Sequence, residues 1–165
     1  MAWFERGGLP PEEYRELSAA AAGPVRVLAW ARGEGTLAVG LAGRLAIRDG
    51  SGWAFVAWEQ IDRGGWDPDS GELRWQGEAV SGQVALAEPG RLPDLFRERV
   101  TASILLQQPV ELGRGRRAMI VARRSPEGSG GISWRVTPPA DGLRDGEAPT
   151  VDEALAQLRA EYDIA

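Results

Sequence analysis

The sequence lacks four residue types altogether, because its 165 residues include no cysteine, histidine, lysine or asparagine. Without histidine or cysteine there is no Ser-His or Cys-His nucleophile, no thiol redox centre and no conventional zinc site. Without lysine there is no Schiff base and no P-loop lysine. Paired carboxylates could in principle still catalyse. So many of the side chains that act in acid–base catalysis are missing, however, that we expect a non-catalytic protein with no metal site and no cofactor.

Long apolar runs are also missing. The longest candidate, residues 17–31, is interrupted by Gly23, Pro24 and Arg26, whereas a membrane span needs about 20 apolar residues. The first eight residues, MAWFERGG, contain neither a basic region nor an apolar stretch of the kind that secretion requires. We therefore expect a cytoplasmic protein with no membrane span. All nineteen basic residues are arginine, which points to a genome rich in G and C.

Residues 1–24 are expected to form an N-terminal helical segment. Pro10 or Pro11 suits a first helical turn, and Gly23 ends the helix. One modest apolar face is expected from four residues: Leu9, Tyr14, Leu17 and Ala21. Trp3 and Phe4 precede any clear element, and as an exposed aromatic pair they could dock on another subunit.

From Val25 the apolar period changes from helical to alternating, which indicates strands. The alternation places Val27 and Ala31 on the same side of the first strand. Six or seven short strands separated by turn signals predict an antiparallel barrel or sandwich. They cover residues 25–32, 36–41, 44–49, 51–61, a short piece ending at Trp66, 72–75 and 82–87.

Residues 64–75, GGWDPDSGELRW, can be read as a calcium loop or as a hairpin. Counted from Asp67, a calcium loop needs a ligand at its fifth position and glycine at its sixth. Those positions hold Gly71 and Glu72, so the glycine comes one place early and a ligand is lost. Turn residues at 68–71 between two tryptophan-bearing segments instead predict a hairpin.

The pattern becomes helical again over residues 91–108, with Pro93 in the first turn and Pro109 after the end. We expect this amphipathic helix to close one end of a partly open barrel over residues 25–111. Residues 112–165 then predict a strand–strand–helix unit, with strands at 116–124 and 132–137 and a helix from Thr150. The fold class is therefore α+β and mainly antiparallel β.

Three segments resemble a family of bacterial pleckstrin-homology-like proteins found in actinobacteria. They are VLAWARGEGTLAVGLAGRLAI, WEQIDRGGWDPDSGELRW and LFRERVTASILL, which lie within residues 25–108. The resemblance implies a seven-stranded barrel closed at one end by a helix, and it implies no catalytic residues. Pleckstrin-homology domains often bind phosphoinositides through basic loop residues, but the loop GEGT at 33–36 lacks that basic pattern.

Charge is uneven along the chain. Residues 114–135 carry a balance of +5 and residues 136–165 a balance of −5. The basic stretch could bind a protein partner, phosphate or nucleic acid, or its arginines could pair with the acidic segment that follows. Strand alternation splits the arginines between two faces, and the chain is acidic overall. Both observations argue against nucleic-acid binding. The candidate partner-binding residues are Arg114, Arg116, Arg117, Arg123, Arg124 and Arg135.

Five of the seven tryptophans fall in the strand region, where they predict core packing rather than a ligand pocket. The composition and patterns together favour a cytoplasmic interaction or scaffold module that binds a protein partner or itself. The alternative is a protein that binds a small apolar or anionic ligand through the tryptophan-rich barrel or the arginine-rich hairpin.

Overall fold

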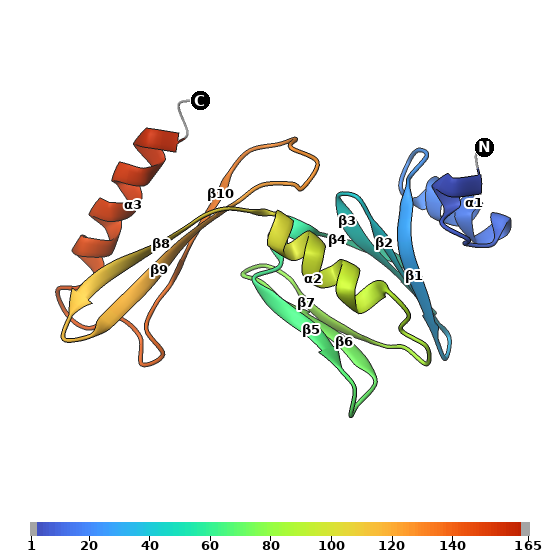
Figure 1. Cartoon of the computed structure of the whole chain (residues 1–165), viewed down its shortest axis with the longest axis horizontal. Coiled ribbons are helices and arrows are strands. Elements are labelled where there is room, and N and C mark those ends of the chain that lie inside the picture. Colours follow the sequence, from blue (N-terminus) through green and yellow to red (C-terminus); the bar gives the residue numbers. More distant parts are fainter. Residues whose placement is uncertain (1–2, 163–165) are drawn as a thin grey trace. The chain divides into compact units, whose positions relative to one another are not determined.

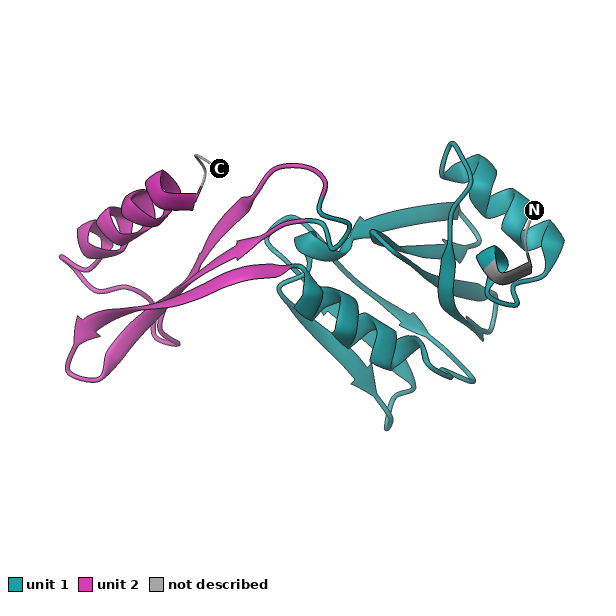
Figure 2. Ribbon diagram, turned by 45° about the horizontal axis from the view of Figure 1, so that its top comes forward, with its two compact units in different colours: residues 1–103, 125–128 teal, residues 104–124, 129–165 magenta. Residues whose placement is uncertain are grey.

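The computed structural model describes residues 3–162, and the chain divides into two compact units (Figure 2). Unit 1 comprises residues 1–103 together with 125–128, and unit 2 comprises residues 104–124 and 129–165. Unit 1 contains two short 3₁₀ helices, η1 (Trp3–Arg6) and η2 (Trp58–Gln60), and two α-helices, α1 (Pro11–Ala20) and α2 (Leu92–Ala102). Its strands are β1 (Val27–Gly33), β2 (Thr36–Leu41), β3 (Arg44–Asp49), β4 (Gly52–Ala57), β5 (Arg63–Asp67), β6 (Glu72–Gln76) and β7 (Ser81–Ala85). Unit 2 contains β8 (Ile104–Gly113), β9 (Arg116–Arg123), β10 (Ser133–Thr137) and α3 (Ala148–Tyr162).

The strands form three antiparallel sheets in the orders β1-β2-β3-β4, β5-β6-β7 and β10-β9-β8. The prediction of a mainly antiparallel α+β protein is confirmed. The seven strands of unit 1 make two sheets and do not close into a barrel. At one corner the sheets meet, where the Ala87 N–H donates to the Arg32 carbonyl at 2.9 Å. The predicted hairpin is confirmed, with Trp66 opposite Leu73 and Gly71 at a φ of +68° in its turn.

The predicted helix over 91–108 is wrong in its last third. Helix α2 ends at Ala102, and residues 104–113 form strand β8 of unit 2. The apolar spacing of Val100 and Ile104 suits a helix, but Ile104 pairs with Arg123, far along the chain. Pro109 lies inside β8, which tolerates it because β8 is an edge strand. Unit 2 is therefore a three-stranded sheet with one helix, where the sequence predicted two strands and a helix.

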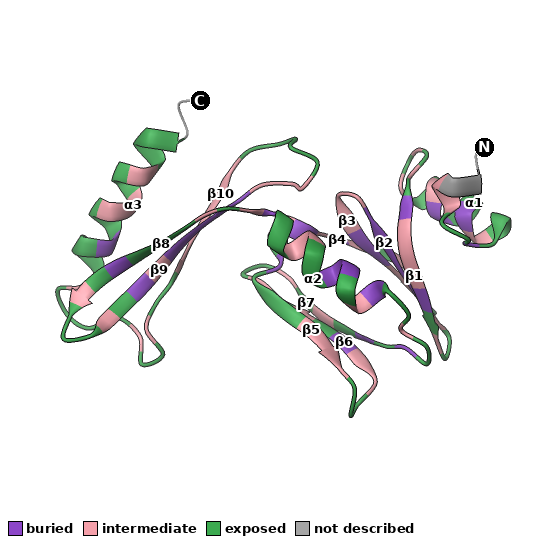
Figure 3. Cartoon of the chain, in the orientation of Figure 1, coloured by how far each residue is buried: buried purple, intermediate pink, exposed green. Residues whose placement is uncertain are grey.

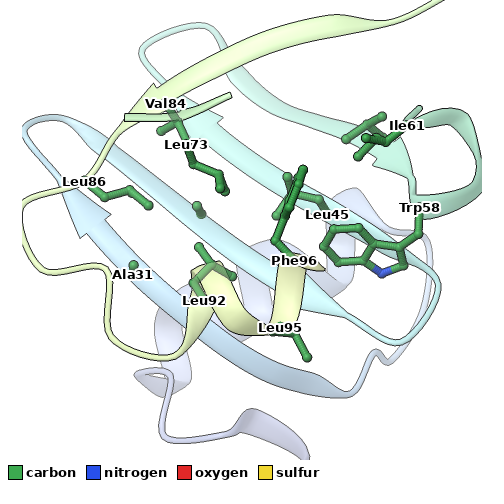
Figure 4. Close-up of a cluster of buried hydrophobic side chains, with 12 residues drawn as sticks. Ala31, Leu45, Trp58, Ile61, Leu73, Val84, Leu86, Leu92, Leu95 and Phe96 are labelled. Atoms are coloured by element: carbon green, nitrogen blue, oxygen red, sulfur yellow. The ribbon is translucent and has the colours of Figure 1, made fainter. Parts of the chain in front are cut away.

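The main core of unit 1 lies between its two sheets, and α2 fills one end of it (Figures 1 and 4). Trp58 is fully buried there and meets Phe96 of α2 edge to face, with ring centroids 5.8 Å apart. The Trp58 Nε1–H donates to the Leu41 carbonyl at 2.8 Å, so the indole nitrogen is satisfied despite its burial. Trp58 thereby ties the turn after β4 to the end of β2 and to α2.

The opposite face of the first sheet is covered by the N-terminal segment (Figure 3). Three of the four residues predicted for its apolar face, Leu9, Tyr14 and Leu17, are buried against this sheet. The Tyr14 hydroxyl donates to the Val25 carbonyl at 2.5 Å, which fixes the chain where it enters β1. The first sheet is consequently buried on both of its faces, and β2 (Thr36–Leu41) has no fully exposed residue.

One predicted face assignment is wrong at the start of β1. The pairing of β1 with β2 shifts between Val27 and Ala29, which is a β-bulge. An extra residue in a strand reverses the side on which the following side chains lie. Val27 therefore packs beneath α1, whereas Ala31 belongs to the core between the sheets. Strict alternation had placed both on one side.

A group of ion pairs attaches α1 to the first sheet. The Glu13 carboxylate accepts from the guanidiniums of Arg32 and Arg48, the latter at 3.0 Å. Arg48 also donates to Glu16 at 2.7 Å. Hydrogen bonding from Arg32, with added attraction from Arg48, lowers the pKa of Glu13 below its ordinary value. Glu13 therefore stabilises the docked helix as a carboxylate.

The core of unit 2 lies between its sheet and α3, which buries Val151 against Ala118 and Ile120. A second link is electrostatic. Arg116 donates to the Asp141 carboxylate at 2.7 and 2.8 Å and to the Glu147 carboxylate at 3.0 and 3.1 Å. These bonds raise the pKa of Arg116 and lower those of Asp141 and Glu147. Arg116 thus holds the segment that leads into α3.

We expect Glu13→Gln to lower the free energy of unfolding of unit 1 by about 1 kcal/mol, allowing for solvent screening of the half-exposed Arg32. Because the folded-state pKa of Glu13 is lowered, its contribution is present above the ordinary value of 4.5 and is lost as pH falls through the folded-state value. Denaturant unfolding followed by tryptophan fluorescence at several pH values measures the free energy of unfolding and its pH dependence. Glu16→Gln is the matched control and should cost less, since Glu16 is 54% exposed and has one partner. Equal costs, or a cost independent of pH, would contradict the interpretation.

We expect Arg116→Gln to loosen α3 on the sheet of unit 2, because it leaves two carboxylates without their cation. Amide hydrogen exchange of residues 147–162 should become faster. Arg117→Gln is the control on the neighbouring residue, since Arg117 is 62% exposed and forms one ion pair, with Glu111. It should leave the exchange of α3 unchanged. Unchanged α3 exchange in Arg116→Gln would show that apolar contacts alone hold the helix.

Candidate functional site

A cleft opens at the end of unit 1 where β3 and β4 face the β6–β7 turn. Ile47, Val56, Trp75 and Val80 give it apolar walls, with Asp49 and Gln83 among its polar lining residues, and its volume is about 520 Å³. We call it the inter-sheet cleft. All four apolar residues also pack at the core between the sheets, so the cleft is an open continuation of that core. Its size and mixed lining are those of ligand sites in proteins.

The Trp75 indole has a glycine opposite it on each adjacent strand, and one of them makes room for the ring. Trp75 pairs with Gly64 of β5 on one side and Gly82 of β7 on the other. A Cβ on Gly82 would lie 2.4 Å from the Trp75 ring, so only glycine leaves room for the ring to lie across β7. Gly82 therefore makes room for the indole, whereas a Cβ on Gly64 would lie 2.8 Å from the Phe96 ring. The indole is left half-buried, with part of its surface open.

Two unpaired strand edges border the inter-sheet cleft. Strand β4 pairs with β3 alone, so its other edge forms no ladder within residues 3–162. Strand β7 pairs with β6, and only its far end, at Ala85 and beyond, is bonded to the first sheet. Ala54–Val56 and Ser81–Gln83 therefore present backbone edges on either side of the hollow. Free strand edges of this kind can pair with an added extended chain.

A fixed negative charge lies at the rim of the cleft. The Asp49 carboxylate accepts from the Ser51 hydroxyl at 2.6 Å and from the Ser51 backbone N–H at 2.8 Å. These two hydrogen bonds lower the pKa of Asp49. Asp49 is therefore a carboxylate at neutral pH and favours a basic group in whatever occupies the cleft.

The sequence predictions did not single out this cleft. They placed the strand-region tryptophans in the core, which holds for Trp58, while Trp75 lines the cleft. A usable signal was present in two glycines, because Gly64 lies just before Trp66 and Gly82 begins the predicted strand 82–87. Both pair with Trp75. Glycine within a strand often marks a close approach of another group. That signal becomes informative only once the pairing register is known.

The six candidate arginines do not form one patch. Arg114 lies in the tight turn between β8 and β9, with a φ of +53°. Arg116 points to the α3 side of the sheet, where it is held by Asp141 and Glu147. Arg117, Arg123 and Arg135 belong to the other face. Arg117 and Arg123 lie an even number of positions from Val121 along β9, and Arg135 pairs with Val121. The predicted division between two faces is confirmed, as is the core position of Trp134 beside Val136.

Access also differs among these arginines. Arg123 is 4% exposed, Arg124 and Arg135 are half-buried, and Arg114 and Arg117 are exposed. Arg117 pairs with Glu111 at 3.1 Å. Arg116 is already bound by the carboxylates of Asp141 and Glu147. The arrangement favours internal pairing for Arg116 and Arg117.

Two kinds of site are not found in the part of the chain that the structure describes. Residues 3–162 hold no group of three or more Asp or Glu side chains that could bind a metal ion. No helix in the same range is long and apolar enough to cross a bilayer. The side chains of Trp3 and Phe4, predicted as a possible docking pair, lie outside the described residues.

Comparison with models of protein families, with curated proteins and with solved structures finds no match to this chain.

Proposed function

We propose that unit 1 is a non-catalytic interaction module with a pleckstrin-homology-like arrangement, and that it binds an extended segment of a protein partner. The arrangement is supported by the order of elements: four antiparallel strands, then three, then a helix that fills one end of the space between the two sheets. The corner at Arg32 and Ala87 joins the sheets as a partly open barrel requires.

The observation that carries the binding proposal is the position of the inter-sheet cleft between two unpaired strand edges. An extended peptide can pair its backbone with β4 at Ala54–Val56 while alternate side chains point into the hollow. A volume of about 520 Å³ accommodates a large apolar side chain beside Trp75. The fixed charge of Asp49 favours a basic residue next to it. We therefore expect a motif in which an aromatic or aliphatic residue lies close to arginine or lysine.

Selection from a random peptide library against the full chain tests this motif directly. Enriched peptides should combine an apolar anchor with a basic neighbour and should bind with saturable affinity by calorimetry. Peptide binding should slow amide hydrogen exchange at Ala54–Val56, because those edge groups gain partners. Saturable binding of a small apolar compound, with no protection of β4, would replace the peptide proposal with a small-ligand site in the same cleft.

We expect Ala54→Trp to weaken peptide binding by at least about tenfold, or about 1.4 kcal/mol, by filling the cleft. Ala54 is exposed, so the fold should tolerate the larger side chain. Ala19→Trp, at an exposed position on α1 away from the cleft, is the control and should bind as the unchanged protein does. Asp49→Asn should weaken the same peptides less, and only those that carry the basic residue. Selected peptides that bind Ala54→Trp and the unchanged protein equally well would refute the site.

A further inference from the structure

A second cavity, of about 490 Å³, lies where α2 faces the start of β1, and three arginines line it. They are Arg26, Arg91 and Arg99, and the one acidic side chain in the lining is Glu98. We call this cavity the arginine pocket. It shares no lining residue with the inter-sheet cleft. Three cations against one carboxylate leave a local balance of +2.

The fold holds the walls of the arginine pocket in place. Arg91, Leu95 and Arg99 are spaced four residues apart, so they follow one side of α2. Arg26 stands immediately before β1, opposite this helix face. Gly7 closes another side: its φ is +54°, and a Cβ there would lie 2.7 Å from the Val27 carbonyl oxygen. The Gly7 carbonyl also accepts from the Trp30 Nε1–H at 3.1 Å, which fixes this wall to the sheet.

Two of the three arginines of this pocket differ from Arg32 and Arg48 in their partners. Arg32 and Arg48 are each paired with a carboxylate of α1. Arg26 and Arg91 are exposed and form no ion pair with any residue in the described range 3–162. Arg99 donates to Glu98 at 3.1 Å, but its Nε is buried and has no hydrogen-bond partner there.

Neighbouring guanidiniums repel one another unless an anion lies between them, and an unpartnered buried N–H costs free energy. The planar guanidinium matches the oxygens of a phosphate, to which it can donate two parallel bonds. The N-terminal end of α2, beside Arg91, adds a favourable partial positive charge. We propose that the arginine pocket binds a small phosphate-bearing dianion, with Arg26, Arg91 and Arg99 as its ligands.

Titration of the full chain with inorganic pyrophosphate, followed by calorimetry and by amide chemical shifts, tests this site. We expect saturable binding that weakens with salt and shifts amides at the start of α2 and around Ala42, which also lines the pocket. Arg26→Gln and Arg91→Gln should each weaken binding about tenfold, because each removes charge-assisted bonds. Neither side chain has an ion-pair partner among residues 3–162, so both variants should fold.

Arg97→Gln is the matched control on the same helix. Arg97 does not line the pocket, and its nearest acidic partner, Asp94, is 3.9 Å away. The Arg97→Gln variant should bind pyrophosphate as the unchanged protein does. An equal loss of pyrophosphate affinity in Arg97→Gln and Arg91→Gln would mean that binding depends only on the overall positive charge of the helix, and it would overturn the site. So would the absence of saturable binding at low salt.

The phosphate could belong to a free molecule or to a lipid headgroup, and vesicles separate the two sources. A pocket for a free dianion predicts no greater sedimentation with phosphatidylglycerol vesicles than with phosphatidylcholine vesicles. Sedimentation with phosphatidylglycerol that is lost in Arg26→Gln, without pyrophosphate binding, would overturn the free-ligand assignment in favour of a lipid headgroup. Because Ala54→Trp leaves this pocket intact, it should bind pyrophosphate normally whether or not the peptide proposal holds.

Discussion

The organisation of unit 1 depends on burying both faces of one antiparallel sheet. Strands β1–β4 carry apolar side chains in both directions, so the sheet needs a cover on each side. The second sheet and α2 cover one face, and the N-terminal segment with α1 covers the other. Neither cover is optional, because exposure of either face would leave a large apolar surface in water. The ion pairs of Glu13 and the hydroxyl of Tyr14 fix the position of a helix that burial already requires.

The same requirement explains where the cavities lie. Helix α2 supplies Leu92, Leu95 and Phe96 to one end of the space between the sheets and fills it. At the opposite end no helix of residues 3–162 fills the space, and there Gly82 takes a position where a side chain would meet the Trp75 ring. The inter-sheet cleft is thus the place where core packing ends. The arginine pocket has another origin, since it forms where the polar side of α2 meets the start of β1.

Local patterns in the sequence were sufficient for most elements of unit 1. The ranges predicted for β2 and β3 match the observed strands, because alternation and turn residues act over a few positions. The errors arise where distant residues decide. Residues 104–108 suit a helix by spacing, yet they form β8 because β9 offers a partner. The bulge at the start of β1 and the exposure of Trp75 likewise depend on a strand register that spacing alone does not contain.

Arginine clusters show why charge along a chain is a poor guide to a binding site. The densest cluster, within residues 114–135, includes Arg116, whose two carboxylates come from later in the chain, in the loop before α3. Its charge is largely used within unit 2. Arg26 and Arg91 stand 65 positions apart in the sequence, so no short stretch of sequence contains both. The fold nevertheless brings them to one cavity whose lining has a single acidic residue. What distinguishes a binding cation from a structural one is the number of carboxylates that the fold brings within reach. That number is a property of tertiary structure, which the local net charge of the sequence does not contain.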